Sequence, residues 1–183
     1  MKSLLLLLCL SGFLLSAQQE NVSKPLNYGF SVYTGWLGEV ESVWFGPSVF
    51  VEKNNHQFEL GTGYHPFVRN YQHKFTGEFM YKFFSKGVDQ PISFYPLACI
   101  SVTRNDHFKS IASGDFARKE TYAACMFGLG MQVKLFDKAY LGLNVSTGIS
   151  TVGSRSNSGK YTYNMFKHYD FEKGVRFHIG YRL

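Results

Sequence analysis

The chain has 183 residues, of which 17% are aromatic and 17% charged, and it contains 18 Phe, 12 Tyr and 18 Gly. This length suits one domain, and an aromatic, glycine-punctuated composition is typical of an all-β protein. The net charge of +6 comes from Lys and Arg residues that are scattered along the chain. Nucleic-acid binding is therefore not indicated, because it requires cations gathered on one element.

The first 17 residues read as a cleaved secretory signal. Lys2 precedes a largely apolar run over residues 4–15, and the small residues Ser16 and Ala17 stand before a polar stretch. We expect cleavage after Ala17, followed by a short N-terminal segment over residues 18–26 and by the domain itself over residues 27–183. After Ala17, no segment approaches the roughly 20 consecutive apolar residues that a membrane helix needs.

Alternation of apolar and polar residues predicts eight strands, because a strand turns successive side chains to opposite faces. The expected strands span residues 27–36, 43–52, 57–68, 75–84, 92–103, 122–135, 140–150 and 169–183. Alternation is clearest in residues 75–84 and weakest in residues 92–103, which are largely apolar on both faces. Pro47, Pro66 and Pro96 fall inside expected strands, where each removes a ladder donor, so we expect bulges or early strand ends there.

Two hairpin registers follow from matching the faces of neighbouring strands. Opposing Glu52 with Gln57 aligns the apolar residues of the second and third strands. An equivalent alignment of the third and fourth strands, with Val68 opposite Phe75, places His65 opposite Glu78 and predicts an ion pair between them.

The last segment, VRFHIGYRL, has apolar residues at every second position. An apolar outer face with a polar inner face is the pattern of a transmembrane β-barrel. The segment also resembles the C-terminal signal by which outer-membrane barrel proteins of Gram-negative bacteria are recognised for assembly, although a Leu stands where the terminal aromatic residue is usual. The residues of this expected assembly signal are Val175, Phe177, Ile179, Tyr181 and Leu183.

From the expected signal peptide to this last strand, the whole chain resembles the small outer-membrane β-barrel proteins of Gram-negative bacteria, often called porin-family or OmpA-like barrels. The resemblance implies an all-β fold, an eight-stranded antiparallel up-and-down transmembrane β-barrel, inserted into the cell outer membrane by the barrel-assembly machinery. With a periplasmic N-terminus, the second, fourth and sixth connections are short, and the two longest, residues 104–121 and 153–168, lie outside, as such barrels require. The resemblance names no activity, because many functions share this fold.

Charged residues of the expected strands fall mostly on the inner face. An eight-stranded lumen is filled by side chains, and charges buried there must pair or hold water. The predicted interior charge network comprises His65, Glu78, Glu59, Lys82, Arg176 and His178, with Glu52, Lys134 and Arg182 also inward. Tyr33, Trp44, Phe50 and Phe84 share this face, so we expect a plugged lumen.

No catalytic, cofactor or metal constellation is recognised. The His residues include no pair at metal-ligand spacing, and none is followed two residues later by Ser, as it is in barrel enzymes that deacylate lipid A. The cysteines that remain after signal cleavage, Cys99 and Cys125, are expected on opposite faces. A disulfide between them would therefore need a bulge.

Three functions remain open. The first is a structural or surface-interaction barrel whose external loops contact lipopolysaccharide or a partner protein. The second is an outer-leaflet lipid-modifying enzyme or a small-solute channel, and the third is a secreted soluble barrel with its apolar faces inward. Cations available in the long connections are Lys109, Arg118, Lys119, Arg155, Lys160 and Lys167.

Overall fold

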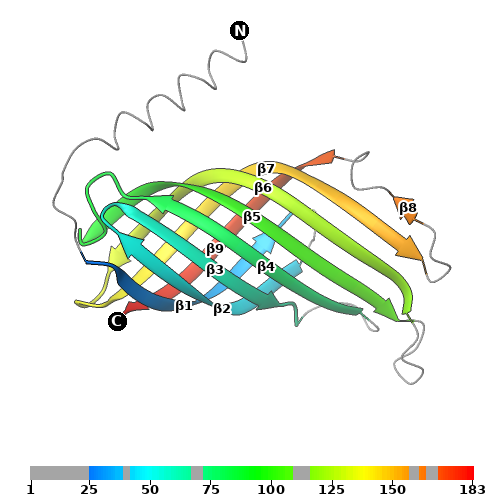
Figure 1. Cartoon of the computed structure of the whole chain (residues 1–183), viewed down its shortest axis with the longest axis horizontal. Coiled ribbons are helices and arrows are strands. Elements are labelled where there is room, and N and C mark those ends of the chain that lie inside the picture. The colour runs from blue at the N-terminus through cyan, green and yellow to red at the C-terminus, as the bar shows by residue number, and fades with distance from the viewer. Residues whose placement is uncertain (1–24, 39–41, 67–71, 109–115, 157–160, 164–168) are drawn as a thin grey trace, which may run out of the picture.

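The computed structural model describes residues 25–38, 42–66, 72–108, 116–156, 161–163 and 169–183, so the expected signal peptide lies outside the described residues. These residues form one closed antiparallel sheet (Figure 1). No helix long and apolar enough to span a membrane occurs in the described part of the chain. The wall consists of β1 (Asn27–Leu37), β2 (Ser42–Lys53), β3 (His56–Tyr64), β4 (Gln72–Phe83), β5 (Ile92–Phe108), β6 (Phe116–Lys134), β7 (Ala139–Ser156) and β9 (Tyr169–Arg182). The short β8 (Tyr161–Tyr163) pairs only with the end of β7.

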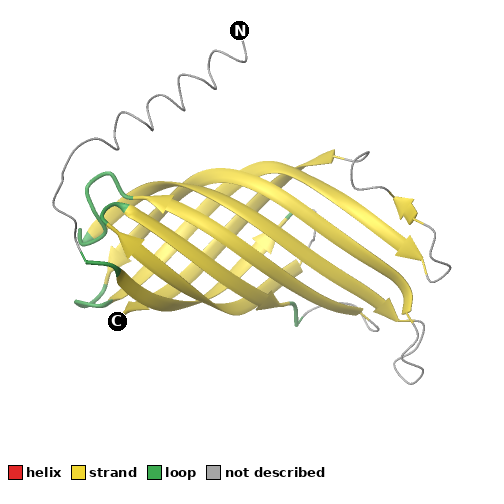
Figure 2. Cartoon of the chain, viewed as in Figure 1, coloured by secondary structure: helices red, strands yellow, loops and turns green. Residues whose placement is uncertain are grey.

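The eight-stranded barrel predicted from the sequence is thus confirmed. Each wall strand pairs with the next, and β9 closes the barrel by pairing with both β7 and β1. Following paired residues from Asn27 around the wall leads back to β1 at Leu37, ten residues further along. This stagger tilts the strands to the barrel axis by roughly 35–45°, and the tilt is visible in Figure 2.

Short turns lie at the end of the barrel where the C-terminus lies (Figure 2). The β2–β3 turn contains Asn54 at a φ of 55°, a left-handed conformation that Asn tolerates in tight hairpins. The β6–β7 turn is closed by Leu135, whose N–H donates to the Ala139 carbonyl at 2.9 Å. The β4–β5 turn folds back over the mouth of the barrel, so Phe84 and Val88 are buried.

The third strand is shorter than predicted and pairs with β4 in a different register. β3 ends at Tyr64, before Pro66, and Tyr64 rather than Val68 opposes Phe75. The residue opposite Glu78 is therefore Gly61, and the predicted ion pair between His65 and Glu78 is wrong. A register shift of four residues leaves every side chain on its original face, so the alternation of apolar residues cannot distinguish the two registers.

The other two prolines lie within strands. Pro47 opposes Val32 of β1, and β2 pairs with β3 at Phe45 and again from Ser48, so the ladder is interrupted beside Pro47 without a register shift. Pro96 pairs with Leu129 of β6 and lies just beyond the last residue pair of β4 with β5, Lys82 with Leu97. The β5–β6 register does not shift at Pro96, so the bulge expected there does not form.

Large apolar side chains cover the outside of the wall. Leu129 and Phe94 are 71% and 70% exposed, whereas Trp44 on the inner face is 1% exposed. The predicted outward faces of β1, β3, β4 and β6 all show this arrangement. The alternative of a soluble barrel with inward apolar faces is therefore wrong.

Candidate functional site

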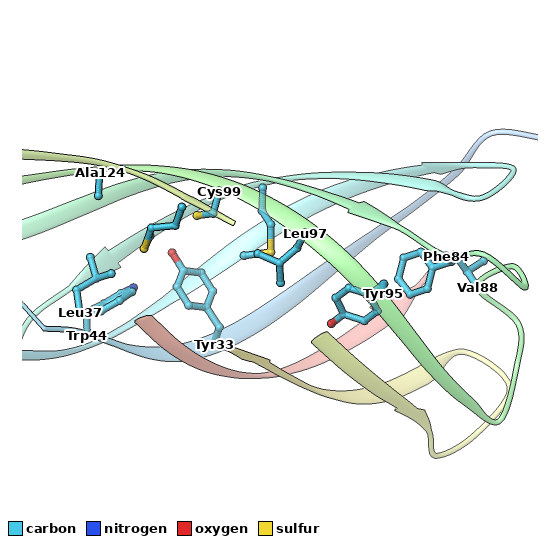
Figure 3. Close-up of a cluster of buried hydrophobic side chains, with 11 residues drawn as sticks. Tyr33, Leu37, Trp44, Phe84, Val88, Tyr95, Leu97, Cys99 and Ala124 are labelled. Carbon is cyan, nitrogen blue, oxygen red and sulfur yellow. The ribbon is translucent and has the colours of Figure 1, made fainter. Parts of the chain in front are cut away.

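Side chains fill the interior of the barrel along its length. Figure 3 shows Leu37, Trp44 and Ala124 toward one end, Tyr95, Phe84 and Val88 toward the other, and Tyr33, Cys99 and Leu97 between them. The cavity in the lumen has a volume of about 10 Å³. This volume is near the lower limit for a single water molecule, so side chains fill the lumen around this cavity.

An ion pair closes the short-turn end of the lumen. Arg182 of β9 donates from Nε to Glu52 Oε2 of β2 at 3.0 Å. The same guanidinium donates from Nη2 to the carbonyl of Val88 at 3.0 Å. Arg182 on β9 therefore binds both Glu52, which is two strands away on β2, and the inward-folded β4–β5 turn.

A second ion pair lies further along the axis. Lys82 Nζ is 2.7 Å from Glu59 Oε2, and both side chains are almost fully buried. The other oxygen of Glu59 accepts hydrogen bonds from Ser48 and, at 3.0 Å, from Ser31. Lys82 Nζ is also 3.5 Å from Nε2 of His178. The carboxylate is thus held by one cation and two hydroxyl donors, as a buried charge requires.

The third ion pair crosses the lumen. Arg176 of β9 pairs with Glu78 of β4, which is four strands away in the eight-stranded wall and therefore on the opposite side. The Arg176 guanidinium also lies 4.9 Å from the ring centre of Tyr33. Its Nη1 donates to Met80 Sδ at 3.5 Å, and its Nη2 lies 3.9 Å from Cys99 Sγ.

His65 belongs to a chain of side-chain hydrogen bonds near the other end. Its Nε2 is 2.7 Å from Thr76 Oγ1, which is 2.7 Å from Thr103 Oγ1. The imidazole also packs against the indole of Trp44, with ring centres 5.6 Å apart. The structure therefore places all six predicted network residues inside the barrel, but it pairs Glu78 with Arg176 and Glu59 with Lys82.

Two buried acids escaped the sequence analysis, and one inward cation is less buried than expected. Glu172 of β9 is 1% exposed, and it shares the parity of Arg176, so the alternation could have identified it. Glu120 accepts a hydrogen bond from Asn105 at 3.2 Å. It escaped the sequence analysis because residues 104–121 are predicted to be a connection, whereas β6 begins at Phe116. Lys134 lies at the rim, 3.9 Å from Asp137.

The residues of the expected assembly signal line the outside of β9. Their exposed fractions are 42% for Val175, 45% for Phe177, 52% for Ile179, 41% for Tyr181 and 70% for Leu183. Ile179 opposes Val32 of β1 on one side and Leu141 of β7 on the other. The apolar face of β9 is thus continuous with its neighbours, while the role of these residues in assembly stays a prediction.

The two cysteines point to opposite faces, as predicted. Cys99 is buried in the lumen, Cys125 is exposed on the outer face, and both are free thiols. Within the described residues, no three His, Cys, Asp or Glu side chains form a group that could hold a metal ion.

Comparison with known proteins identifies the fold. The N-terminal β-barrel domain of OprF from Pseudomonas aeruginosa matches with a TM-score of 0.61 and 10% sequence identity, over 88% of this chain and 99% of that domain. A major outer membrane protein from Thermus thermophilus matches with a TM-score of 0.54 and 10% identity, over 87% of this chain and 100% of that one. No protein-family model matches the chain, and no curated protein matches it by sequence.

The chain therefore has the eight-stranded antiparallel β-barrel fold of these outer-membrane proteins. In this chain the barrel encloses three buried ion pairs and is capped by the inward-folded β4–β5 turn.

Proposed function

We propose that this protein is an integral, non-conducting barrel of the bacterial outer membrane with a structural or surface-interaction role. The observation that carries the proposal is the distribution of polarity across the wall: apolar side chains cover the outside, and three buried ion pairs lie inside. Water would disfavour such an exterior, whereas hydrocarbon favours it, because a lipid-facing strand needs apolar residues at alternate positions.

Aromatic residues mark the two borders of this exterior. Tyr28 of β1 and Tyr181 of β9 lie near the short-turn end, while Trp36 and Tyr64 lie near the opposite end, and all four are at least 40% exposed. Rings of amphipathic side chains at both membrane interfaces are a feature of outer-membrane barrels. They support a membrane orientation along the barrel axis.

The orientation follows from the lengths of the connections. At the short-turn end, two residues join β2 to β3, four join β6 to β7 and eight join β4 to β5. The longest connection lies at the opposite end, where residues 157–168, which include β8, join β7 to β9. Outer-membrane barrels have short periplasmic turns and longer external loops. This supports a periplasmic location for the short-turn end and for the N-terminal segment over residues 18–26, with β7 and β8 extending outward.

The external end supplies groups that could contact lipopolysaccharide phosphates or a partner protein. Lys173 is exposed near this end of β9, with its Nζ 5.9 Å from the ring centre of Phe171. Lys119 is also exposed, and Arg104 is bound by Asp106 at 3.0 Å. The other cations of the long connections, Lys109, Arg118, Arg155, Lys160 and Lys167, have side chains outside the described residues. Lipopolysaccharide contact follows from charge, because cations at a membrane surface attract anionic head groups.

The filled lumen supports a role without solute transport. Three ion pairs and the buried turn residues Phe84 and Val88 lie in the lumen, and this filling supports a barrel without a continuous water path. We expect the barrel-assembly machinery to insert the chain, and the pairing of β9 with β1 then closes the wall around the filled lumen. The proposal assigns no catalytic step to the chain.

Two measurements test this function. Fractionation of cells that express the full chain should recover the protein in the outer membrane, resistant to extraction by salt and alkaline buffer. Purified protein added to planar bilayers should show no steady conductance. Recovery in a soluble fraction would overturn membrane insertion, and a steady conductance altered by Glu78→Gln would replace the non-conducting barrel with a small-solute channel.

A further inference from the structure

Three sulfur-bearing side chains stand next to each other on the inner wall. Met80 of β4 is the direct cross-strand partner of Cys99 in β5, and Cys99 is in turn the partner of Met126 in β6. All three point into the lumen and are 1–2% exposed. Directly opposed residues have Cβ atoms about 4.5–5.5 Å apart, so Cys99 lies directly between the two methionines. Methionine side chains are long and flexible, so both thioether sulfurs of this sulfur row can approach the Cys99 thiol.

The sulfur row lines the cavity of about 10 Å³ in the lumen. Gly174 of β9 lies against the same space, and a Cβ added there would be 2.9 Å from Ser146 Oγ and 3.5 Å from Met126 Sδ. The absence of a side chain at Gly174 therefore keeps room beside the Met126 sulfur. Toward the external end, the cavity is bordered by Leu37 and Trp44.

Polar contacts to the sulfurs come from donors. Arg176 reaches Met80 Sδ at 3.5 Å and Cys99 Sγ at 3.9 Å, Asn144 Nδ2 donates to Met80 Sδ at 3.5 Å, and Ser146 Oγ donates to Met126 Sδ at 3.6 Å. The sulfurs are therefore oriented as electron-pair donors. Arg176 itself is neutralised by its ion pair with Glu78.

We propose that Met80, Cys99 and Met126 form a binding site for a soft monovalent metal ion of the cuprous class. Thiolate and thioether ligands select such ions, whereas hard cations prefer oxygen ligands. On binding, Cys99 loses its thiol proton to solvent and forms a sulfur–metal bond, while the two thioethers donate lone pairs without a change of charge. One positive charge replaces another, so the net charge of the buried site is unchanged.

The charge balance also sets the selectivity of the site. A divalent ion would add one uncompensated positive charge beside Arg176, which is expensive in a buried environment. A monovalent ion avoids this cost. The ion pair of Arg176 with Glu78 keeps the charges beside Cys99 balanced.

Silver(I) is the appropriate probe, because it is soft, monovalent and inert to oxidation by air. The reference protein is the full chain with Cys9→Ser and Cys125→Ser, which leaves Cys99 as its single thiol. Native mass spectrometry in detergent, with free methionine as competitor, should detect one silver ion per folded barrel. Cys99→Ser should abolish binding, and Met80→Leu or Met126→Leu should weaken it at least tenfold.

Met131→Leu provides the matched control, because Met131 lies on β6 like Met126 but points to the outer face. It should bind silver like the reference protein. Equal affinity in Met126→Leu and Met131→Leu, retained binding in Cys99→Ser, or no bound silver in the reference protein would overturn the proposal. Should Cys99→Ser fail to fold, X-ray absorption of the silver-loaded reference protein decides: three sulfur neighbours support the site, and fewer refute it. Neither result depends on the proposed membrane function.

Discussion

The outer and inner faces of the same strands follow different rules. On the outer face each residue needs only to be apolar, so Ile179 and Phe177 satisfy the membrane independently of their neighbours. On the inner face each charge needs a particular partner, as Arg176 needs Glu78 across the lumen. The outer face should therefore tolerate any apolar substitution, whereas a substitution on the inner face should destabilise the barrel when it removes the partner of a buried charge.

The largest expected effect is on the inner face. Glu78→Ala leaves the Arg176 guanidinium buried without its carboxylate, and breaking a buried ion pair in this way costs about 3–5 kcal/mol. The free energy of unfolding, measured by urea titration in lipid vesicles, should fall by that amount. Combining Glu78→Ala with Arg176→Met removes both charges and should recover part of the loss.

The same experiment distinguishes the two registers of β3 and β4. Adding His65→Gln to Glu78→Ala should recover nothing, because His65 hydrogen-bonds to Thr76 and does not pair with Glu78. Recovery through His65 rather than through Arg176 would restore the register predicted from the sequence.

The outer face should respond to charge at any lipid-facing position. Ile179→Asp places an acid against hydrocarbon and should destabilise the barrel by about 2 kcal/mol, with loss of folded protein from the outer membrane. Ile179→Val is the control and should fold normally. Normal outer-membrane insertion of the Ile179→Asp variant, measured by fractionation and heat-modified gel mobility, would contradict the lipid-facing assignment of β9.

This contrast also explains what the sequence could predict. Alternation identified every wall strand and the inward position of Glu59, Lys82 and Arg176, because the face of a residue depends only on its parity within a strand. The pairing of Arg176 with Glu78 depends on the closure of the sheet and on the registers of the four strand pairs that lead from β9 to β4. Even shifts in any of these registers preserve the pattern, so no local signal fixes the partners.

A smaller effect is expected from the hydroxyls that support the Glu59 carboxylate. Ser48→Ala removes one donor to this buried charge and should cost about 1–2 kcal/mol, in line with hydrogen bonds to charged groups. Ser93→Ala is the matched control, because the buried Ser93 hydroxyl has no hydrogen-bond partner among the described residues. Urea titration should show a change for Ser48→Ala alone, and equal changes for both variants would mean that the Glu59 contacts contribute little.

The smallest effect is expected in the polar connection after β7, where a residue needs neither to be apolar nor to find a specific partner. Residues 154–160 (SRSNSGK) are polar throughout, with no apolar alternation, so the sequence gives no sign that lipid or a packed core requires these side chains. A short epitope inserted after Asn157 should change the free energy of unfolding by no more than about 0.5 kcal/mol, and an antibody should detect it on intact cells. The same epitope inserted after Asn54 interrupts a tight turn with a left-handed residue, so it should destabilise the barrel and be detected only after the outer membrane is permeabilised. The opposite labelling pattern would mean that the barrel is inserted with its short turns outside.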